Sequence, residues 1–226
     1  MQKQYISGEP NTPWKSGHSV LPPHAVSPIE LKTRQFLRDR FRLSPGLRET
    51  AVRINEWTSL VLKNGLDGIA KAAAQRKSPG AALDVIEHIA ESLVADDKAP
   101  THELLSKSLQ ETLLYCTGMD PDLSYAQMKT RLMTFLKRRG GAAVVRRFLT
   151  LSLFNVIWFR TGDAFRGIAR TPATYERDML AVEQFCRRIA ASCWRSQNLS
   201  RRPLDAEALD DLIRGIERRV RQGDRP

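Results

Sequence analysis

The strongest hydrophobic pattern in the chain lies at residues 142–160. From Phe148 to Phe159 this stretch carries no charge, and its large apolar side chains point in every direction around a helical wheel. These side chains are Phe148, Leu149, Leu151, Leu153, Phe154, Val156, Ile157, Trp158 and Phe159. A helix that is apolar all round is normally buried on every side. The pattern therefore predicts a central helix over residues 142–160 that the rest of the fold surrounds.

The remaining chain shows apolar residues at helical spacing and no sustained strand alternation. Helices are predicted over residues 28–41, 45–63, 66–75, 79–95, 102–117, 125–139, 172–196 and 205–222. Their connections are short, which favours antiparallel packing of neighbouring helices. We expect an all-α, multi-helix bundle of about eight to nine helices with no β-sheet.

Helix starts are marked by a repeated dipeptide, a hydroxyl residue followed by proline. The hydroxyl satisfies a free N–H group at the helix start, and proline at the first helical position has no N–H to lose. The four hydroxyl residues are Ser27, Ser44, Ser78 and Thr171. Glu30 after Ser27 and Gln127 after Ser124 complete capping boxes. Further caps are expected at Thr101 and Asp205, and at Gly65 where a helix ends.

Three regions follow from this pattern. Residues 1–26 are rich in proline and serine and show no apolar period, which predicts a flexible tail. Residues 27–199 form the expected all-helical globular domain, in which the apolar seam of the 172–196 helix faces the core or, alternatively, a coiled-coil partner. Residues 204–222 predict an amphipathic helix that either docks peripherally on the body or forms an oligomer contact.

Charge is distributed very unevenly. The chain has a net charge of +11, and residues 129–170 alone carry ten Lys and Arg against one Asp. Residues 84–122 are the opposite pole, with nine Asp and Glu against two Lys. A basic segment of this kind favours an anionic partner, with nucleic acid first and an anionic membrane surface or an acidic protein second.

Within the basic segment, one compact cluster surrounds a Gly-Gly turn between two predicted helices. Lys137, Arg138 and Arg139 precede the turn, while Arg146 and Arg147 lie one to two helical turns after it. We expect these five residues to share a surface that binds backbone phosphates. Arg160 and Arg166, near the other end of the central helix, are expected to form a second patch. The alternative is that these cations cover the core, pair with the acidic segment or promote solubility.

No pattern of catalytic residues is recognisable. Asp84, Glu87, His88 and Glu91 share one face of a helix, but the opposite face is apolar, so the acidic face is expected to point to water. Asp163 is interpreted as the cap of a further short helix after a turn at residues 161–163. We therefore expect a protein that is not an enzyme and has no metal site and no cofactor.

The cysteines and the hydropathy profile indicate a soluble, cytoplasmic protein. The three cysteines form no CxxC motif, and Cys186 and Cys193 lie roughly 10 Å apart along one helix, too far to form a disulfide. The N-terminus lacks the apolar core of a secretory signal. The longest uncharged apolar run, residues 148–159, is short of the about 20 residues of a membrane span, so none is predicted.

Taken together, these features favour a non-catalytic, nucleic-acid-associated helical subunit that contacts phosphate backbones through the basic patch within a larger assembly. No motif for reading a base sequence is present, and the choice between DNA and RNA stays open. The alternative is a protein–protein interaction module, an adaptor or a translocated effector, with a protein partner or a homo-oligomeric state. A third hypothesis is a small-molecule sensor with a cavity beside Trp158.

Overall fold

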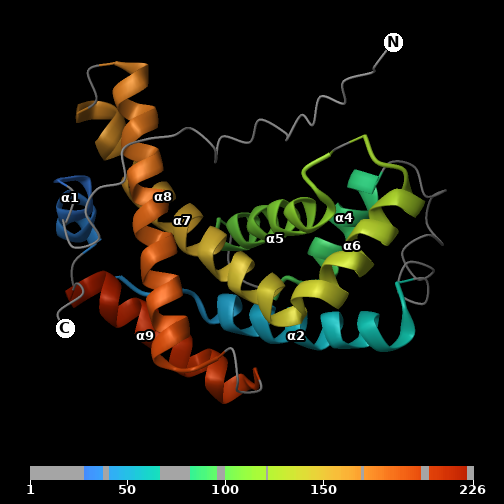
Figure 1. The fold of residues 1–226 in the computed structure, drawn as a ribbon. Coiled ribbons are helices and arrows are strands. Elements are labelled where there is room, and N and C mark those ends of the chain that lie inside the picture. Colours follow the sequence, from blue (N-terminus) through green and yellow to red (C-terminus); the bar gives the residue numbers. More distant parts are fainter. Residues whose placement is uncertain are drawn as a thin grey trace, which may run out of the picture.

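The computed structural model describes residues 28–37, 41–66, 82–95, 100–120, 122–168, 171–199 and 204–222. Over these ranges the chain forms eight helices and no sheet, which confirms the all-α prediction (Figure 1). The helices are α1 (Pro28–Leu37), α2 (Pro45–Asn64), α4 (Ala82–Leu93), α5 (Thr101–Thr117), α6 (Tyr125–Arg139), α7 (Gly141–Ile168), α8 (Pro172–Ser196) and α9 (Ala206–Gln222). The predicted tail, and the predicted 66–75 helix apart from Leu66, lie outside the described residues.

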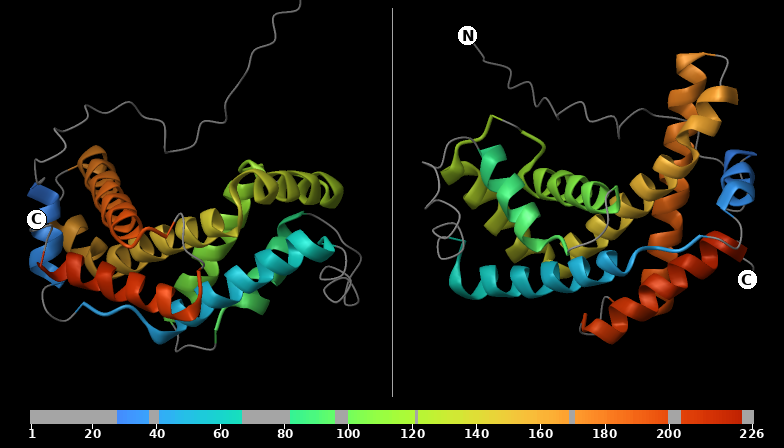
Figure 2. Two further views of the ribbon diagram at one scale, coloured as in Figure 1. Left: turned by 60° about the horizontal axis from the view of Figure 1, so that its bottom comes forward. Right: turned by 180° about the vertical axis from the view of Figure 1, so that it is seen from behind.

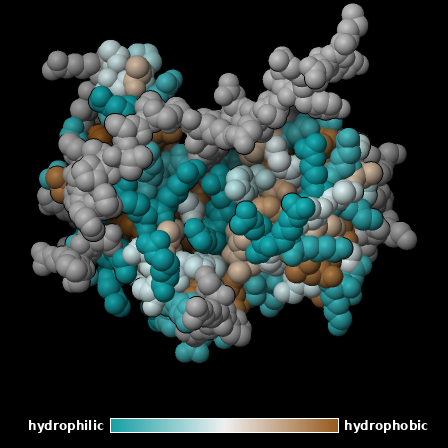
Figure 3. Space-filling view, viewed as in Figure 1, coloured by the Kyte–Doolittle hydropathy of each residue, from teal (hydrophilic) through white to brown (hydrophobic). Residues whose placement is uncertain are grey.

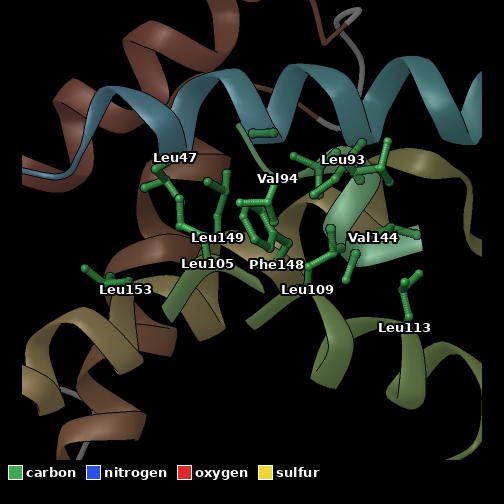
Figure 4. Close-up of a cluster of buried hydrophobic side chains, with 14 of the residues drawn as sticks. Leu47, Leu93, Val94, Leu105, Leu109, Leu113, Val144, Phe148, Leu149 and Leu153 are labelled. Carbon is green, nitrogen blue, oxygen red and sulfur yellow. The ribbon is translucent and has the colours of Figure 1, made fainter. Parts of the chain in front are cut away.

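The central helix of the fold is α7. It packs most extensively against α5, α8 and α2, and Figure 1 shows it crossing the middle of the molecule. Phe148 is fully buried there and lies among Leu105 and Leu109 of α5 and Leu47 of α2 (Figure 4). The prediction of a central helix that other helices surround therefore holds for residues 148–153 of α7, which are all buried.

The prediction that the helix is buried on every side was wrong for the C-terminal half of α7. Phe159 is 58% exposed, while Phe154 and Trp158 are only partly buried. Asn155 still donates to the Ser108 hydroxyl of α5 at 2.9 Å, but Figure 1 shows the last turns of α7 beyond this point beside α8. Fewer helices surround this end, so its apolar side chains are partly open to solvent.

The predicted helix break at residues 161–163 was also wrong, because α7 continues to Ile168. The buried Thr161 hydroxyl donates to the carbonyl of Ile157 within the same helix, at 2.8 Å. Asp163 is exposed and lies 3.7 Å from the Arg166 guanidinium instead of capping a new helix. A single glycine, Gly162, does not end the helix because the surrounding positions keep their helical contacts.

Most of the predicted caps are confirmed. The Ser44 and Thr171 hydroxyls accept from backbone N–H groups three residues on, both at 3.2 Å. Ser124 and Gln127 form a complete capping box. The Asp205 carboxylate accepts from the Ala208 N–H at 2.8 Å, and Gly65 ends α2.

One cap was wrong, and two cannot be placed. Thr101 is the first residue of α5 and makes no capping bond, because the preceding position is occupied by Pro100. Ser27 and Ser78 lie outside the described residues. Of the helix predicted over residues 28–41, the described part Pro28–Leu37 is helical, residues 38–40 lie outside the described residues, and Phe41 is not helical.

The two C-terminal helices both turn their apolar sides inward. In α8, the seam residues Val182, Cys186, Ile189 and Cys193 are buried, which agrees with the core-facing interpretation. The apolar face of α9 is likewise buried within the chain: Ala208, Leu209, Leu212, Ile213, Ile216 and Val220.

Polar contacts hold α9 to the body. The Leu43 N–H donates to the Glu217 carboxylate at 2.8 Å, and Arg48 of α2 lies 3.8 Å from Asp210. Both views in Figure 2 show α2 and α9 side by side. In this conformation the apolar stripe of α9 is therefore not presented to a second protein.

Among the described helices, α7 is long and apolar enough, by length and composition, to cross a membrane. A buried core helix of a globular protein can meet the same two criteria. Here Val144, Phe148 and Ile157 are fully buried by the protein's own helices.

Candidate nucleic-acid interface

An open groove of about 1270 Å³ lies where four helices meet. Its walls are the C-terminal end of α5, the helix α6 and the C-terminal half of α8, and its floor is the first part of α7. The floor residues Ala142, Arg146 and Thr150 recur every four positions and so share one face of α7. The opposite face of the same helix, with Val145 and Phe148, packs into the core.

The groove is strongly basic. Among the described residues, six arginines line it and no acidic residue does: Arg131, Arg138, Arg139, Arg146, Arg147 and Arg187. Figure 3, drawn from the same side as Figure 1, shows hydrophilic side chains gathered over the middle of this face, between α8 and α6. The fold therefore brings cations from three different helices together on one concave surface.

The turn between α6 and α7 brings the arginines of these two helices together. Gly140 has φ 74° and ψ 168°, a conformation that side chains rarely permit, and its N–H donates to the Leu136 carbonyl at 2.8 Å. A Cβ atom at Gly141 would lie only 2.1 Å from the Thr58 hydroxyl oxygen of α2. Both glycines are thus required by the local geometry, and the turn carries Arg138 and Arg139 to the same groove as Arg146.

Three of the six arginines are exposed and form no ion pair within the described residues. Arg138, Arg139 and Arg146 are exposed, and within the part of the chain that the structure describes none of them pairs with a carboxylate. Arg131 and Arg187 differ, because Arg131 lies 3.6 Å from Asp120 and Arg187 forms an ion pair with Glu183. The free positive charge of the groove is therefore centred on the α6–α7 turn.

Arg147 is part of the groove floor and is not an exposed surface cation. Its guanidinium lies 4.5 Å from the centre of the Tyr115 ring. Burial lowers the pKa of Arg147, as does the neighbouring charge of Arg187, while Tyr115 and Glu183 act in the opposite direction. Burial likewise raises the pKa of Glu183, against the effects of Arg187 and Arg147. Arg147 therefore lines the groove as predicted, but its guanidinium is held against the Tyr115 ring within the protein.

Aromatic residues also line the groove, which the sequence did not indicate. Tyr115 of α5 is 46% exposed, and its ring meets that of Phe135 of α6 in a T-shaped contact with a centroid distance of 6.1 Å. Tyr115 stands alone in the sequence, so only the packing of α5 against α6 reveals the pair. Arg187 was missed for the same reason, since it lies 40 residues beyond Arg147.

The other predicted cations do not line the groove. Lys137 is exposed on α6 but lies outside the lining. Arg160 and Arg166 lie about 21 Å and 30 Å from Arg146 along the axis of α7. Arg160 donates to the Arg42 carbonyl at 3.3 Å and Arg166 lies 5.8 Å from the Tyr175 ring, so each contacts its own surroundings.

The remaining candidates offer little chemistry in the described residues. No group of His, Cys, Asp and Glu among them is placed to hold a metal ion, and Asp84, Glu87 and Glu91 are exposed on α4. All three cysteines are buried free thiols, and burial raises the pKa of Cys116 to about 12. Trp158 packs against the rings of Phe154, Phe165 and Tyr175.

Comparison with protein families, curated proteins and solved structures finds no match to this chain. The geometry of the groove is thus the basis for assigning a function.

Proposed function

We propose that this protein binds nucleic acid through its phosphate backbone, in the groove between α5, α6, α7 and α8, as a non-catalytic component of a larger assembly. The observation that carries the proposal is the convergence of Arg138, Arg139 and Arg146, exposed and without carboxylate partners among the described residues, on a concave surface that no acidic residue lines.

Arginine is well suited to this ligand. Its planar guanidinium offers paired N–H donors that match two phosphate oxygens, and it stays charged at any physiological pH. Each neutralised phosphate releases condensed counterions, so affinity grows with the number of contacts and falls with salt. Contacts of this kind position a protein on nucleic acid without reading its sequence, in agreement with the absence of any base-reading motif in the sequence.

The length of the groove floor agrees with a short stretch of backbone. From Ala142 to Thr150 the floor of α7 rises about 12 Å, at 1.5 Å per residue. Of the three exposed arginines, Arg146 lies on this floor and Arg138 and Arg139 lie on α6 beside it. Together they can contact up to about three phosphates of a bound strand.

The test is a salt titration of binding with the full-length chain and a labelled strand, compared with two charge-reversal variants. The groove variant is R138E/R139E/R146E. The matched control, K63E/K107E/R218E, changes the net charge equally at exposed positions outside the groove. For single strands, log K falls with log salt with a slope of about −0.7 per phosphate contact, so losing three contacts should flatten the slope by about 2.

We expect the groove variant to lose binding while the control retains most of it and both keep the wild-type circular dichroism spectrum. Equal losses in the two variants would contradict the proposal, because the affinity would then reflect net charge alone. An acidic protein segment is the alternative ligand, since carboxylates form the same paired contacts with arginine. Displacement of a bound strand by a poly-glutamate peptide, stronger than displacement by sulfate at equal ionic strength, would favour that alternative.

A further inference from the structure

The groove contains an exposed aromatic ring that phosphate binding does not use. Of the three aromatic residues that line it, Trp194 is buried and Phe135 is half-buried, whereas Tyr115 is 46% exposed. Exposed rings in basic grooves commonly serve single-strand binding, because every base has a flat face that can stack on them.

The Tyr115 ring is held in place from two sides. The Arg147 guanidinium lies 4.5 Å from its centre, a cation–π contact. The Phe135 ring meets it at an angle of 79° and a centroid distance of 6.1 Å. A ring that neighbouring side chains already immobilise loses little conformational freedom when it binds a ligand.

The ring also lies next to the arginines that are free to bind phosphate. Phe135, which contacts Tyr115, is three and four residues before Arg138 and Arg139 on α6, so all three share one side of that helix. Arg147, which covers the Tyr115 ring, directly follows the exposed Arg146 on α7. Stacking and phosphate binding are therefore available within about one helical turn of each other.

We infer that the ligand of this groove is single-stranded nucleic acid, with one base stacked on Tyr115 and adjacent phosphates on Arg138, Arg139 and Arg146. This inference rests on the proposed function. In a duplex the bases are paired and stacked inside the helix, so their faces cannot reach Tyr115. A single strand can turn one base onto the ring and keep its backbone on the arginines.

The experiment compares three ligands of equal length: an unstructured 12-nucleotide DNA strand, a strand of the same length that is abasic at every position, and the corresponding blunt duplex. The abasic strand keeps all phosphates but offers no base to stack. Each ligand is titrated against the wild-type chain, Tyr115→Leu, which removes the aromatic ring, and Tyr115→Phe, which keeps it.

We expect the wild type to bind the intact strand about 5- to 150-fold more tightly than the abasic strand, the range that stacking of one base on an aromatic side chain provides. Tyr115→Leu should lose this preference, Tyr115→Phe should keep it, and duplex binding should be the same in all three proteins. Equal affinity of the wild type for the intact and abasic strands would overturn the inference, and this comparison needs no variant.

The result also separates this inference from the proposed function. If R138E/R139E/R146E abolishes binding to every ligand but Tyr115→Leu changes none, the phosphate groove stands and the single-strand inference is wrong. If no ligand binds in a salt-dependent manner, the proposed function itself is wrong.

Discussion

Replacing Gly141 by alanine is expected to force α7 away from α2. A Cβ atom at this position would lie 2.1 Å from the Thr58 hydroxyl oxygen and 2.9 Å from the Thr58 Cβ. Thr58 is fully buried, and its hydroxyl donates to the Asn55 carbonyl at 2.9 Å. Rotating this stiff, β-branched side chain would break that hydrogen bond and would still leave its Cβ in the way. The backbones of the two helices must therefore separate.

The expected cost follows from two opposing effects. Overpacking a well-packed site typically costs about 1–3 kcal/mol, and alanine in place of glycine in a helix returns up to about 1 kcal/mol. We therefore expect the free energy of unfolding to fall by roughly 1–2 kcal/mol. For a chain of this size, this corresponds to a decrease in Tm of about 2–8 °C.

The assay is urea unfolding followed by circular dichroism, with Gly167→Ala as the matched control. Gly167 lies in the same helix, but nothing stands within 4 Å of a Cβ placed there, so this change should be neutral or stabilising by up to about 1 kcal/mol. In a Thr58→Ala background, which removes the hydroxyl and the methyl group, Gly141→Ala should cost less. A Gly141→Ala protein as stable as the wild type would refute the reasoning.

Three further predictions follow from burial. Phe148→Ala should lower the free energy of unfolding in urea by about 3–5 kcal/mol because the residue is fully buried, whereas Phe159→Ala at an exposed position should change it by less than about 1 kcal/mol; similar costs would argue against the assigned core. Burial raises the pKa of Glu111, so its ionised form costs stability in the folded state; Glu111→Gln should therefore gain stability relative to the wild type as the pH rises from 4 to 7, and a difference independent of pH would contradict this. Because burial raises the pKa of Cys116 to about 12 and also that of Cys186, a thiol reagent at pH 8 should label the native protein no faster than it unfolds, and labelling within seconds would show that a thiol is accessible.

Part of the candidate site could be predicted from the sequence. Arg138, Arg139 and Arg146 lie within nine residues around two glycines, so a turn between helices necessarily brings them near one another. Tyr115, Arg131 and Arg187 could not be assigned to the same groove, because α5, α6 and α8 reach it only through their packing around α7. Arg160 and Arg166, equally basic in sequence, lie too far along α7 to join it.

Local patterns of residues were sufficient to predict the helices, most of their caps and the position of the central helix. These features depend on backbone hydrogen bonds and on side chains within about four residues, which sequence spacing describes directly. The packing of the helices, in contrast, explains why Phe159 is exposed, why α7 continues through Gly162 and why the apolar face of α9 is covered. Each of these depends on which helices lie alongside a given segment and at what angle, and that arrangement is a property of the whole packed chain.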